Sequence, residues 1–393
     1  MSGGWLTQME NKKAIVIGAG LYGSVVAHEL AKAGYKVDIY DKRDHIGGNV
    51  YDQKMFGIIV QKYGPHIFHT SNKLIWGYIN QFGKFARYTN TPVSIGADGK
   101  LYNLPFNMNT FTKLYNVKTP KEAIKKINED REEYQNPNNL EEKAISLVGK
   151  KVYNTLIKKY TEKQWGKKAT ELPASIINRL PVRYTFNNDY YRDDYQGIPI
   201  NGYTSIIEKM LNHKNINIHL GGALEPDTIL KAKNPIFYSG SLDELLGYRF
   251  GKLDYRSLRF ETTVLNENNF QGVGVVNNAS DEKYTRTIEH KWLGGFTLDN
   301  NKTVVTREYP CKWQEGRERY YPINIKENNE KYKQYLEVVH NLYRNIIVGG
   351  RLGKYKYLDM STTIDYALTD VCKFIQRDSN TPNYQVMINK MTD

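Results

Sequence analysis

Short apolar runs and closely spaced glycines set the pattern of the first fifty residues. Residues 14–17, Ala-Ile-Val-Ile, have the length and composition of a buried parallel strand. Residues 24–34 then show helical periodicity, and residues 37–40 form a second strand-like run that ends at Asp41. The order of strand, glycine-rich turn, helix and strand predicts a βαβ unit.

The rest of the chain alternates between strand and helix patterns, with one long helical stretch. Thr119, Pro120 and Glu122 have the spacing of a capping box with proline at the first helical position. Residues 140–159 follow as a single amphipathic helix. Strands are expected within residues 57–70, 216–220, 235–240 and 346–350. Residues 88–104 are expected to form strands around a turn at 97–99. Residues 255–309 are expected to form an antiparallel sheet. Further helices are expected at 71–81 with Ser71 as the cap, 202–210, 331–344 and 361–377.

The glycines of the βαβ unit are placed for a dinucleotide. Gly18 permits a tight turn, Gly20 lets the backbone approach a pyrophosphate, and Gly23 lets the helix pack against the strand. The helix N-terminus offers N–H groups to the phosphates, and Asp41 is expected to accept a hydrogen bond from a ribose hydroxyl. A chance glycine turn is the alternative, but this motif stands in its full strand–helix–strand context.

A second pair of glycines decides which dinucleotide is expected. An Asp at position 41 is common for NAD, whereas a Glu is more usual for FAD. Gly47 and Gly48 follow six and seven residues after this acid. They resemble the extended fingerprint of FAD proteins of the glutathione-reductase and amine-oxidase type, where glycines let the chain pass close to the cofactor. FAD is therefore the expected cofactor.

Changes of period along the chain predict an α/β fold with three domains. A Rossmann-like FAD-binding domain is expected from three pieces (12–88, 205–248 and 331–393), with an inserted helical domain (106–175). An antiparallel β-sheet substrate domain is expected from 89–105, 176–204 and 249–330, with residues 1–11 as a tail. The length of 393 residues suits two or three domains.

Composition narrows the class of protein. The hydrophobic content of 40% and charged content of 25% are ordinary for a globular protein, and no apolar run approaches the roughly 20 residues of a membrane span. Cys311 and Cys372 give neither metal-ligand spacing nor a disulfide framework, so no metal site is expected. The first residues lack the apolar core of a signal peptide. A cytoplasmic protein without a membrane partner is expected.

Charge favours anionic partners. The formal net charge is +13, from 55 basic and 42 acidic residues. Because no dense Lys/Arg tract and no nucleic-acid module occurs, nucleic acid is not an expected partner. The charge alone would also suit a non-enzymatic protein that binds a nucleotide or nucleic acid. An anionic small molecule such as a nucleotide suits the scattered arginines and the flat faces of the 31 tyrosines.

Further motifs, in order over nearly the whole chain, resemble those of the bacterial UDP-galactopyranose mutases. They are 64–70 (GPHIFHT), 160–166 (YTEKQWG), 179–183 (RLPVR), 284–290 (YTRTIEH), 320–322 (YYP) and 350–360 (GRLGKYKYLDM). Several of them are distinctive of that family. Residues before 12 and after about 377 fall outside the resemblance.

The resemblance implies an isomerase that interconverts UDP-galactopyranose and UDP-galactofuranose with no net redox change. In this family FAD must be reduced, and its N5 attacks the anomeric carbon, displaces UDP and forms an adduct that recloses as the five-membered ring. The resemblance also implies a homodimer, a cellular reductant such as NAD(P)H or a reductase, and a role in making galactofuranose for cell-surface polysaccharide. Some relatives accept UDP-N-acetylgalactosamine as well, which the sequence leaves open.

The same resemblance assigns residues to the site. Arg179 and Arg286 are expected to clamp the diphosphate, Tyr160 to stack on uracil and Trp165 to flank the sugar. The catalytic residues implied are Arg179, Arg286, His69 and Tyr357, and both His66 and His69 are expected beside the flavin ring. The substrate-binding residues implied are Asn90, Tyr160, Thr161, Trp165, Arg179, Tyr190, Arg256, Arg286, Tyr320, Tyr321 and Tyr357. The cofactor-binding residues are Gly18, Ala19, Gly20, Tyr22, Gly23, Asp41, Lys42, Gly47, Gly48, Asn49, His66, Ile67, Arg351, Asp359 and Met360.

Three departures from the family pattern leave these roles in place. Asp41 replaces the usual Glu, Leu156-Ile157 stands where phenylalanines are common near the uracil, and residues 239–241 are Ser-Gly-Ser instead of Thr-Gly-Pro.

A flavin oxidoreductase of the amine-oxidase type is the alternative function. It shares the βαβ unit and the glycine pair but has no need for the two arginines.

Overall fold

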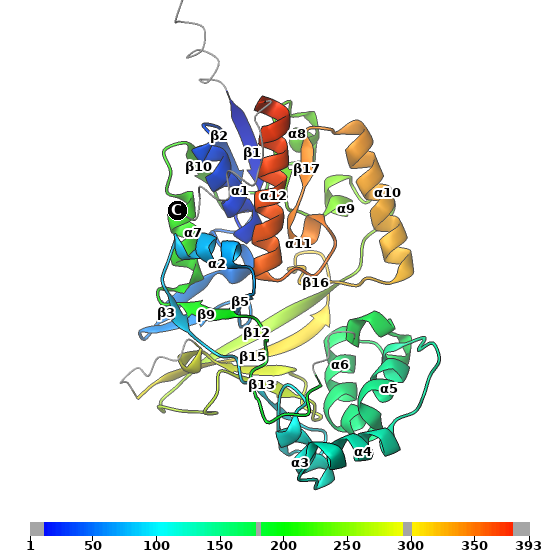
Figure 1. The fold of residues 1–393 in the computed structure, drawn as a ribbon. Helices are drawn as coiled ribbons and strands as arrows, with labels where there is room; N and C mark the ends of the chain where they lie inside the picture. Colours follow the sequence, from blue (N-terminus) through cyan, green and yellow to red (C-terminus); the bar gives the residue numbers. More distant parts are fainter. Residues whose placement is uncertain (1–11, 178–181, 294–300, 380–393) are drawn as a thin grey trace, which may run out of the picture.

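A parallel sheet assembled from three separate parts of the chain forms one half of the molecule (Figure 1). The structure, a computed structural model, describes residues 12–177, 182–293 and 301–379. The strand order is β10 (Ile216–His219), β2 (Lys36–Tyr40), β1 (Lys13–Ile17), β11 (Ile236–Tyr238) and β17 (Ile346–Val348). All four neighbouring pairs are parallel. The prediction of a Rossmann-like sheet is confirmed.

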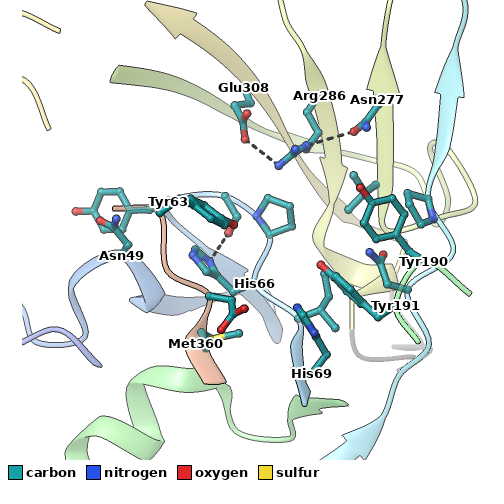
Figure 2. A pocket seen from close by; sticks show the side chains of 18 of the residues that line it. Asn49, Tyr63, His66, His69, Tyr190, Tyr191, Asn277, Arg286, Glu308 and Met360 are labelled. Carbon is teal, nitrogen blue, oxygen red and sulfur yellow. Dashed lines mark hydrogen bonds and ion pairs between the residues drawn. The ribbon is translucent and has the colours of Figure 1, made fainter. Parts of the chain in front are cut away.

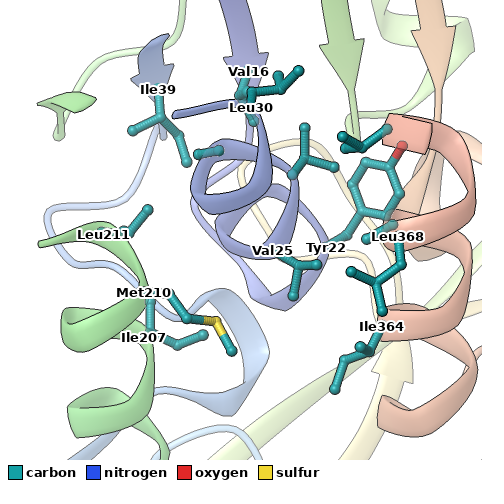
Figure 3. Close-up of a cluster of buried hydrophobic side chains, with 14 of the residues drawn as sticks. Val16, Tyr22, Val25, Leu30, Ile39, Ile207, Met210, Leu211, Ile364 and Leu368 are labelled. Atoms are coloured by element: carbon teal, nitrogen blue, oxygen red, sulfur yellow. The ribbon is translucent and has the colours of Figure 1, made fainter. Parts of the chain in front are cut away.

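Side chains alternate between the two faces of this sheet. On one face, α1 (Leu21–Lys32) lies between α7 (Gly202–Leu211) and α12 (Met360–Ser379), as Figure 3 shows. Ala14 and Val16 of β1 face this cluster, whereas Ile15 and Ile17 face the second cluster, which is covered by α10 (Lys326–Leu342). The short helices α8 (Pro226–Lys231), α9 (Leu242–Leu245) and α11 (Gly350–Gly353) lie along the same half of the molecule. Apolar packing on both faces of β1 therefore supports the glycine turn that follows this central strand.

A second, seven-stranded sheet forms the other half. Its order is β16 (Tyr321–Pro322), β12 (Tyr255–Leu265), β15 (Thr303–Lys312), β14 (Arg286–Glu289), β13 (Val275–Asn278), β7 (Val93–Ile95) and β8 (Leu101–Asn103). Five pairs are antiparallel, but β13 and β7 pair in parallel. The expected antiparallel sheet is thus confirmed. The one parallel pair occurs where β7, from a distant part of the chain, joins β13.

Two small sheets connect these halves. The hairpin β3 (Asp52–Met55) and β4 (Ile58–Gln61) is antiparallel, and β9 (Tyr195–Pro199) pairs with both β5 (Phe68–Thr70) and β6 (Phe85–Arg87). The helix α2 (Lys73–Asn80) follows β5, and its cap is Asn72, whose side chain accepts hydrogen bonds from the amides of Leu74 and Ile75. The prediction of Ser71 as the cap is wrong, because the Ser71 hydroxyl bonds to Asp193 instead.

A cluster of helices lies beside the long strands β12 and β15 (Figure 1). It contains α3 (Met108–Tyr115), α4 (Pro120–Asp130), α5 (Leu140–Val152) and α6 (Lys158–Trp165). The predicted capping box at Thr119 is confirmed. The single helix predicted over 140–159 is wrong, because Gly149 has a φ of 82° and a π-helical turn spans Tyr153–Ile157. Short 3₁₀ segments lie at Gly48–Val50, Ala169–Glu171, Ala174–Ile177 and His290–Trp292.

The domain boundaries expected from the sequence stay a prediction, and the tail 1–11 lies outside the described residues. No helix of residues 12–177, 182–293 or 301–379 combines the length and apolar character that crossing a membrane requires.

Candidate active site

Two cavities form one groove between the two halves of the molecule. A cavity of about 280 Å³ lies over the first βα turn, and a cavity of about 510 Å³ lies beside the seven-stranded sheet. Both cavities are lined by Asn49, His66, Arg351, Asp359 and Met360. Because they share these residues, a long ligand can pass from one into the other.

Bare backbone forms the wall of the smaller cavity. A Cβ on Gly23 would lie 1.9 Å from the carbonyl oxygen of Gly18, and a Cβ on Gly48 would lie 2.9 Å from the Cα of Gly20. Side chains are therefore excluded where the two glycine segments meet. The predicted cofactor residues that line this cavity are Gly18, Gly20, Tyr22, Gly23, Asp41, Lys42, Gly47, Gly48, Asn49, His66, Arg351, Asp359 and Met360.

Asp41 holds the glycine turn in place. Its carboxylate accepts hydrogen bonds from the amide of Ala19 at 2.7 Å and the amide of Arg43 at 2.9 Å. Ala19 is fully buried beneath the turn and supports the cavity without lining it. Arg43, which sequence reasoning missed, pairs with Glu318 at 2.7 Å and stacks on Tyr63 at 4.5 Å. These contacts give the predicted ribose-binding acid a rigid position.

Arg286 lies at the boundary of the larger cavity and binds three side chains from three elements. It donates to Tyr160 Oη at 3.0 Å, Asn277 Oδ1 at 3.3 Å and Glu308 Oε2 at 3.5 Å; Figure 2 shows the last two contacts. Burial works against the charge, but Glu308, with a side chain only 1% exposed, raises the pKa of Arg286 well above its ordinary value. The guanidinium is therefore a fixed positive charge facing the groove.

His66 is a neutral imidazole in the shared part of the groove. Burial, followed by the charge of Arg351, lowers the pKa of His66 to about 4. Its Nδ1 lies 2.8 Å from the carbonyl oxygen of Gly64, so Nδ1 carries the proton. His66 therefore presents an uncharged ring to a ligand at neutral pH.

His69 lies further along the larger cavity. Its Nδ1 lies 2.7 Å from Asp193 Oδ2, and its ring stacks on Tyr191 at 3.7 Å between centroids and an interplanar angle of 13°. Asn90 is 6% exposed, and its Oδ1 has no partner among the residues that the structure describes. Sequence reasoning found His69 and Asn90 but missed Asp193 and Tyr191.

Most of the remaining predicted residues come together around the same cavity. Those that line it are Asn49, His66, Ile67, His69, Asn90, Tyr190, Arg286, Tyr320, Tyr321, Arg351, Tyr357, Asp359 and Met360. Tyr357 is half exposed at 50% and stacks against Arg351 at 4.7 Å. The site is thus rich in tyrosine, which offers both flat faces and hydroxyl groups.

A third cavity of about 270 Å³ adjoins the larger one through Tyr190 and Asn277, which line both. Tyr160, Thr161 and Trp165 were predicted for the substrate and line it. Its other walls are mainly aliphatic and include Leu104, Leu156, Ile157, Ile176 and Ile177. Gln164 also lines it, and its buried Oε1 has no partner within the described part of the chain.

Two predicted residues are not placed at this site. Arg179 lies outside the described residues. Arg256 is 8% exposed and donates from Nε to the Gln164 carbonyl at 2.8 Å and from Nη2 to the Lys163 carbonyl at 3.2 Å. The guanidinium of Arg256 is bound to the C-terminal end of α6 and lines none of these three cavities, and its predicted contact with the substrate stays a prediction. It holds the helix that carries Tyr160 and Trp165.

No cluster of three or more His, Cys, Asp or Glu side chains suited to a metal ion occurs among the residues described. The chemistry available is that of a dinucleotide groove, a fixed arginine and two differently held histidines.

Two family models match separate parts of the chain. The UDP-galactopyranose mutase family model matches residues 155–357, and the NAD(P)-binding Rossmann-like domain model matches residues 16–82. A probable UDP-galactopyranose mutase of Klebsiella pneumoniae is 39% identical over 95% of this chain and 97% of the relative. A dTDP-fucopyranose mutase of Escherichia coli is 36% identical over 91% of this chain and 96% of the relative.

Solved structures share the fold. The crystal structure of a reduced UDP-galactopyranose mutase matches with a TM-score of 0.72 over 98% of this chain and 99% of that chain, at 14% identity. Putrescine oxidase matches with a TM-score of 0.58 over 93% of this chain and 99% of that chain, at 11% identity.

Proposed function

Because this chain belongs to the UDP-galactopyranose mutase family, we propose that it interconverts UDP-galactopyranose and UDP-galactofuranose with FAD as its cofactor. The position of Arg286 carries this proposal. Arg286 lies where the larger cavity meets the third one, bonded to Tyr160 on one side and Glu308 on the other. A diphosphate that joins a sugar in the larger cavity to a base in the third cavity would lie against this guanidinium.

The groove fits FAD along its length. The glycine turn and the N-terminus of α1 suit the pyrophosphate, and Asp41 suits the adenosine ribose. His66, Arg351, Asp359 and Met360 connect this part with the larger cavity and would contact the flavin ring. Reduced FAD, when bound, supplies the nucleophile for the anomeric carbon of the sugar.

Arg286 then has a part in the chemistry as well as in binding. As the anomeric bond breaks, negative charge grows on the departing diphosphate. A fixed guanidinium stabilises that charge most when it is most developed, which lowers the barrier. It also retains UDP for the return step. Arg179 is the proposed second clamp, as the family motif implies, while Tyr357 and His69 are proposed to contact the sugar.

The third cavity suits a pyrimidine that carries an N3–H group. Tyr160 offers a ring for stacking, and the unpartnered Oε1 of Gln164 can accept a hydrogen bond from that N–H. Uracil and thymine both have this donor, whereas cytosine lacks it. We therefore expect UDP and dTDP to bind this enzyme more tightly than CDP.

A dTDP-linked sugar is the second candidate substrate. The dTDP-fucopyranose mutase of Escherichia coli covers nearly the same share of this chain as the Klebsiella relative. The aliphatic walls formed by Leu156 and Ile157 would also tolerate the methyl group of thymine.

Comparison of kcat/KM for UDP-galactopyranose and dTDP-fucopyranose, with furanose products resolved by chromatography, tests the assignment. Higher kcat/KM for the UDP-sugar supports our proposal, and higher kcat/KM for the dTDP-sugar overturns it. UDP-N-acetylgalactosamine in the same assay tests the further breadth that the family resemblance leaves open.

An amine-oxidase-type oxidoreductase has weaker support. Lysine-specific histone demethylase 1B of Mus musculus matches only 57 residues, which is 14% of this chain. That match covers part of the chain, whereas the mutase relatives match over 90% of it.

The partners and setting expected from the family belong to the proposal. We expect a homodimer in the cytoplasm that is reduced by NAD(P)H or by a reductase. Light scattering after size-exclusion chromatography tests the dimer, because a mass near 45.5 kDa would mean a monomer. Flavin bleaching under anaerobic NADH or NADPH tests the reductant.

A further inference from the structure

We propose that Asp193 is a positioning residue of the mutase, which fixes the proton of His69 on Nδ1 and turns Nε2 towards the sugar. The inference rests on the proposed function for its substrate, but its geometry stands independently. Neither the sequence pattern nor the comparisons assign a role to Asp193.

The fold brings the two residues together from distant parts of the chain. His69 is the middle residue of β5, and it lies opposite Gln196 of β9 in the antiparallel pair. Asp193 comes just before β9, so strand pairing places its carboxylate beside the imidazole. Asp193 Oδ2 lies 2.7 Å from His69 Nδ1, across a separation of 124 residues.

The carboxylate and the ring are both held from other sides. Asp193 Oδ1 accepts the hydroxyl of Ser71 at 3.2 Å, and Ser71 Oγ accepts the amide of Asp194 at 3.2 Å. The Tyr191 ring covers one face of the imidazole, as Figure 2 shows. The exposed fractions of the His69 and Asp193 side chains are 20% and 32%. This is a supported pair at the cavity wall, unlike a pair of exposed surface charges.

An ionised carboxylate can only accept hydrogen bonds, so the nitrogen that faces it must carry the proton. This holds for the neutral ring and for the imidazolium. Nε2 has no partner among the described residues and is the nitrogen left for the cavity. A neutral His69 therefore offers a fixed acceptor for a sugar hydroxyl in the cavity that Asn90, with its unpartnered Oδ1, also lines.

Without Asp193, the imidazole can place its proton on either nitrogen. A ring that is protonated on Nε2 would donate where the bound sugar needs an acceptor. The sugar would then be held in a less productive orientation, which costs rate more than cofactor binding.

The decisive experiment measures the tautomer directly. The FAD-loaded enzyme is labelled with ¹⁵N-histidine, and the His69 signals are assigned by their loss in His69→Gln. We expect the neutral ring to be protonated on Nδ1 in the unmodified enzyme and to shift towards the Nε2-protonated form in Asp193→Ala and Asp193→Asn. Both variants should keep their flavin content and lose at least about tenfold in kcat.

Asp194→Asn is the matched control. Asp194 is the next residue, carries the same charge and is exposed, and only its backbone amide takes part in the Ser71 contact. It should leave the tautomer and kcat unchanged. An Nδ1-protonated ring in both Asp193 variants, or normal kcat in both, would overturn the inference. If the unmodified enzyme does not convert UDP-galactopyranose, the proposed function fails, while the tautomer comparison still tests Asp193.

Discussion

Arg286 connects three elements at a single point, since it bonds Tyr160 of α6, Asn277 of β13 and Glu308 of β15. Strand register explains the last contact, because Arg286 and Glu308 are direct partners in the pairing of β14 with β15. The motif at 284–290 predicted Arg286. Nothing in the local sequence predicted Glu308, which lies 22 residues further along the chain.

We predict that Arg286→Ala lowers kcat at least about tenfold. A hydrogen bond to a charged group is worth roughly 1.5–3 kcal/mol, and each 1.36 kcal/mol is about tenfold in rate. Arg286→Lys should restore activity only in part, because lysine lacks the planar fork. Steady-state kinetics and flavin absorbance measure both effects.

Arg307→Ala is the control for this prediction. Arg307 is the neighbour of Glu308 on β15, is exposed, and lies over the Tyr284 ring at 5.5 Å. Its removal should leave kcat nearly unchanged. If Arg286→Ala folds, holds FAD and changes only KM, Arg286 binds the substrate and its transition state equally, and a role in leaving-group stabilisation is excluded.

The glycine turn gives a second prediction for single residues. A Cβ on Gly20 would lie 3.7 Å from the Cα of Gly48, which the protein itself tolerates, but Gly20 lines the cavity proposed for the pyrophosphate. Gly20→Val should therefore fold and purify without yellow colour. Absorbance at 450 nm and circular dichroism check this outcome, and a folded variant with full flavin would refute the proposed FAD position.

The helix α6 shows how an element is positioned for the site. Lys163 Nζ donates to the carbonyl oxygens of Ser280, Glu282 and Tyr284 at 3.1, 2.8 and 3.1 Å, in the segment that leads into β14. Arg256 donates to the carbonyl oxygens of Lys163 and Gln164 in the last turn of α6. These contacts join the helix of Tyr160 to the strand of Arg286.

We predict that Lys163→Met weakens UDP binding about fivefold, the equivalent of about 1 kcal/mol, without loss of FAD. The reason is that Tyr160 and Arg286 lose their common support. Lys159→Met is the control, since within the described part of the chain the ion pair of Lys159 is with Asp281, whose side chain is 89% exposed. Titration with UDP, followed by flavin fluorescence, measures both variants. Equal affinity in the two would mean that Lys163 does not position the site.

The helical cluster also shows where sequence patterns stop being informative. Periodicity identified the helices and the capping box at Thr119. It could not reveal the break at Gly149, where Asp130 of α4 accepts the amide of Lys151 at 2.7 Å. Periodicity also could not reveal the partners of Arg256 and Asp193, which lie 92 and 124 residues away along the chain. Tertiary contacts of this kind leave no local signal, whereas the glycine turn, His66 and Tyr160 lie in recognisable motifs.

For the molecule as a whole, the buried neutral histidine His290 makes the free energy of unfolding depend on pH. His290 joins the β3–β4 hairpin to the seven-stranded sheet. Its Nδ1 accepts a hydrogen bond from the amide of Gln61 in β4 at 3.3 Å, and its Nε2 lies 2.8 Å from Thr306 Oγ1 in β15. Burial lowers the pKa of His290 to about 3. Below about pH 6.5, the unfolded chain therefore binds a proton that the folded chain does not.

We predict that the free energy of unfolding decreases as pH falls from about 6.5 towards 4, by up to about 1.4 kcal/mol per pH unit for His290. Stability from this group is complete above the unfolded pKa and is lost on acidification. His290→Gln should reduce the slope, whereas His340→Gln, at an exposed site on α10, should not. Urea unfolding at several pH values measures the slopes. The prediction is wrong if His290→Gln and the unmodified enzyme have equal slopes.

The central claim is that this protein catalyses an isomerisation, with the flavin, the sugar and the nucleotide bound in the three adjoining cavities. The direct measurement is anaerobic incubation of the reduced enzyme with UDP-galactofuranose, with the product and the flavin redox state followed together. We predict many turnovers to UDP-galactopyranose while the flavin stays reduced, and no turnover by the fully oxidised enzyme. Reoxidation of one flavin per product molecule, or full activity of the oxidised enzyme, would contradict the account.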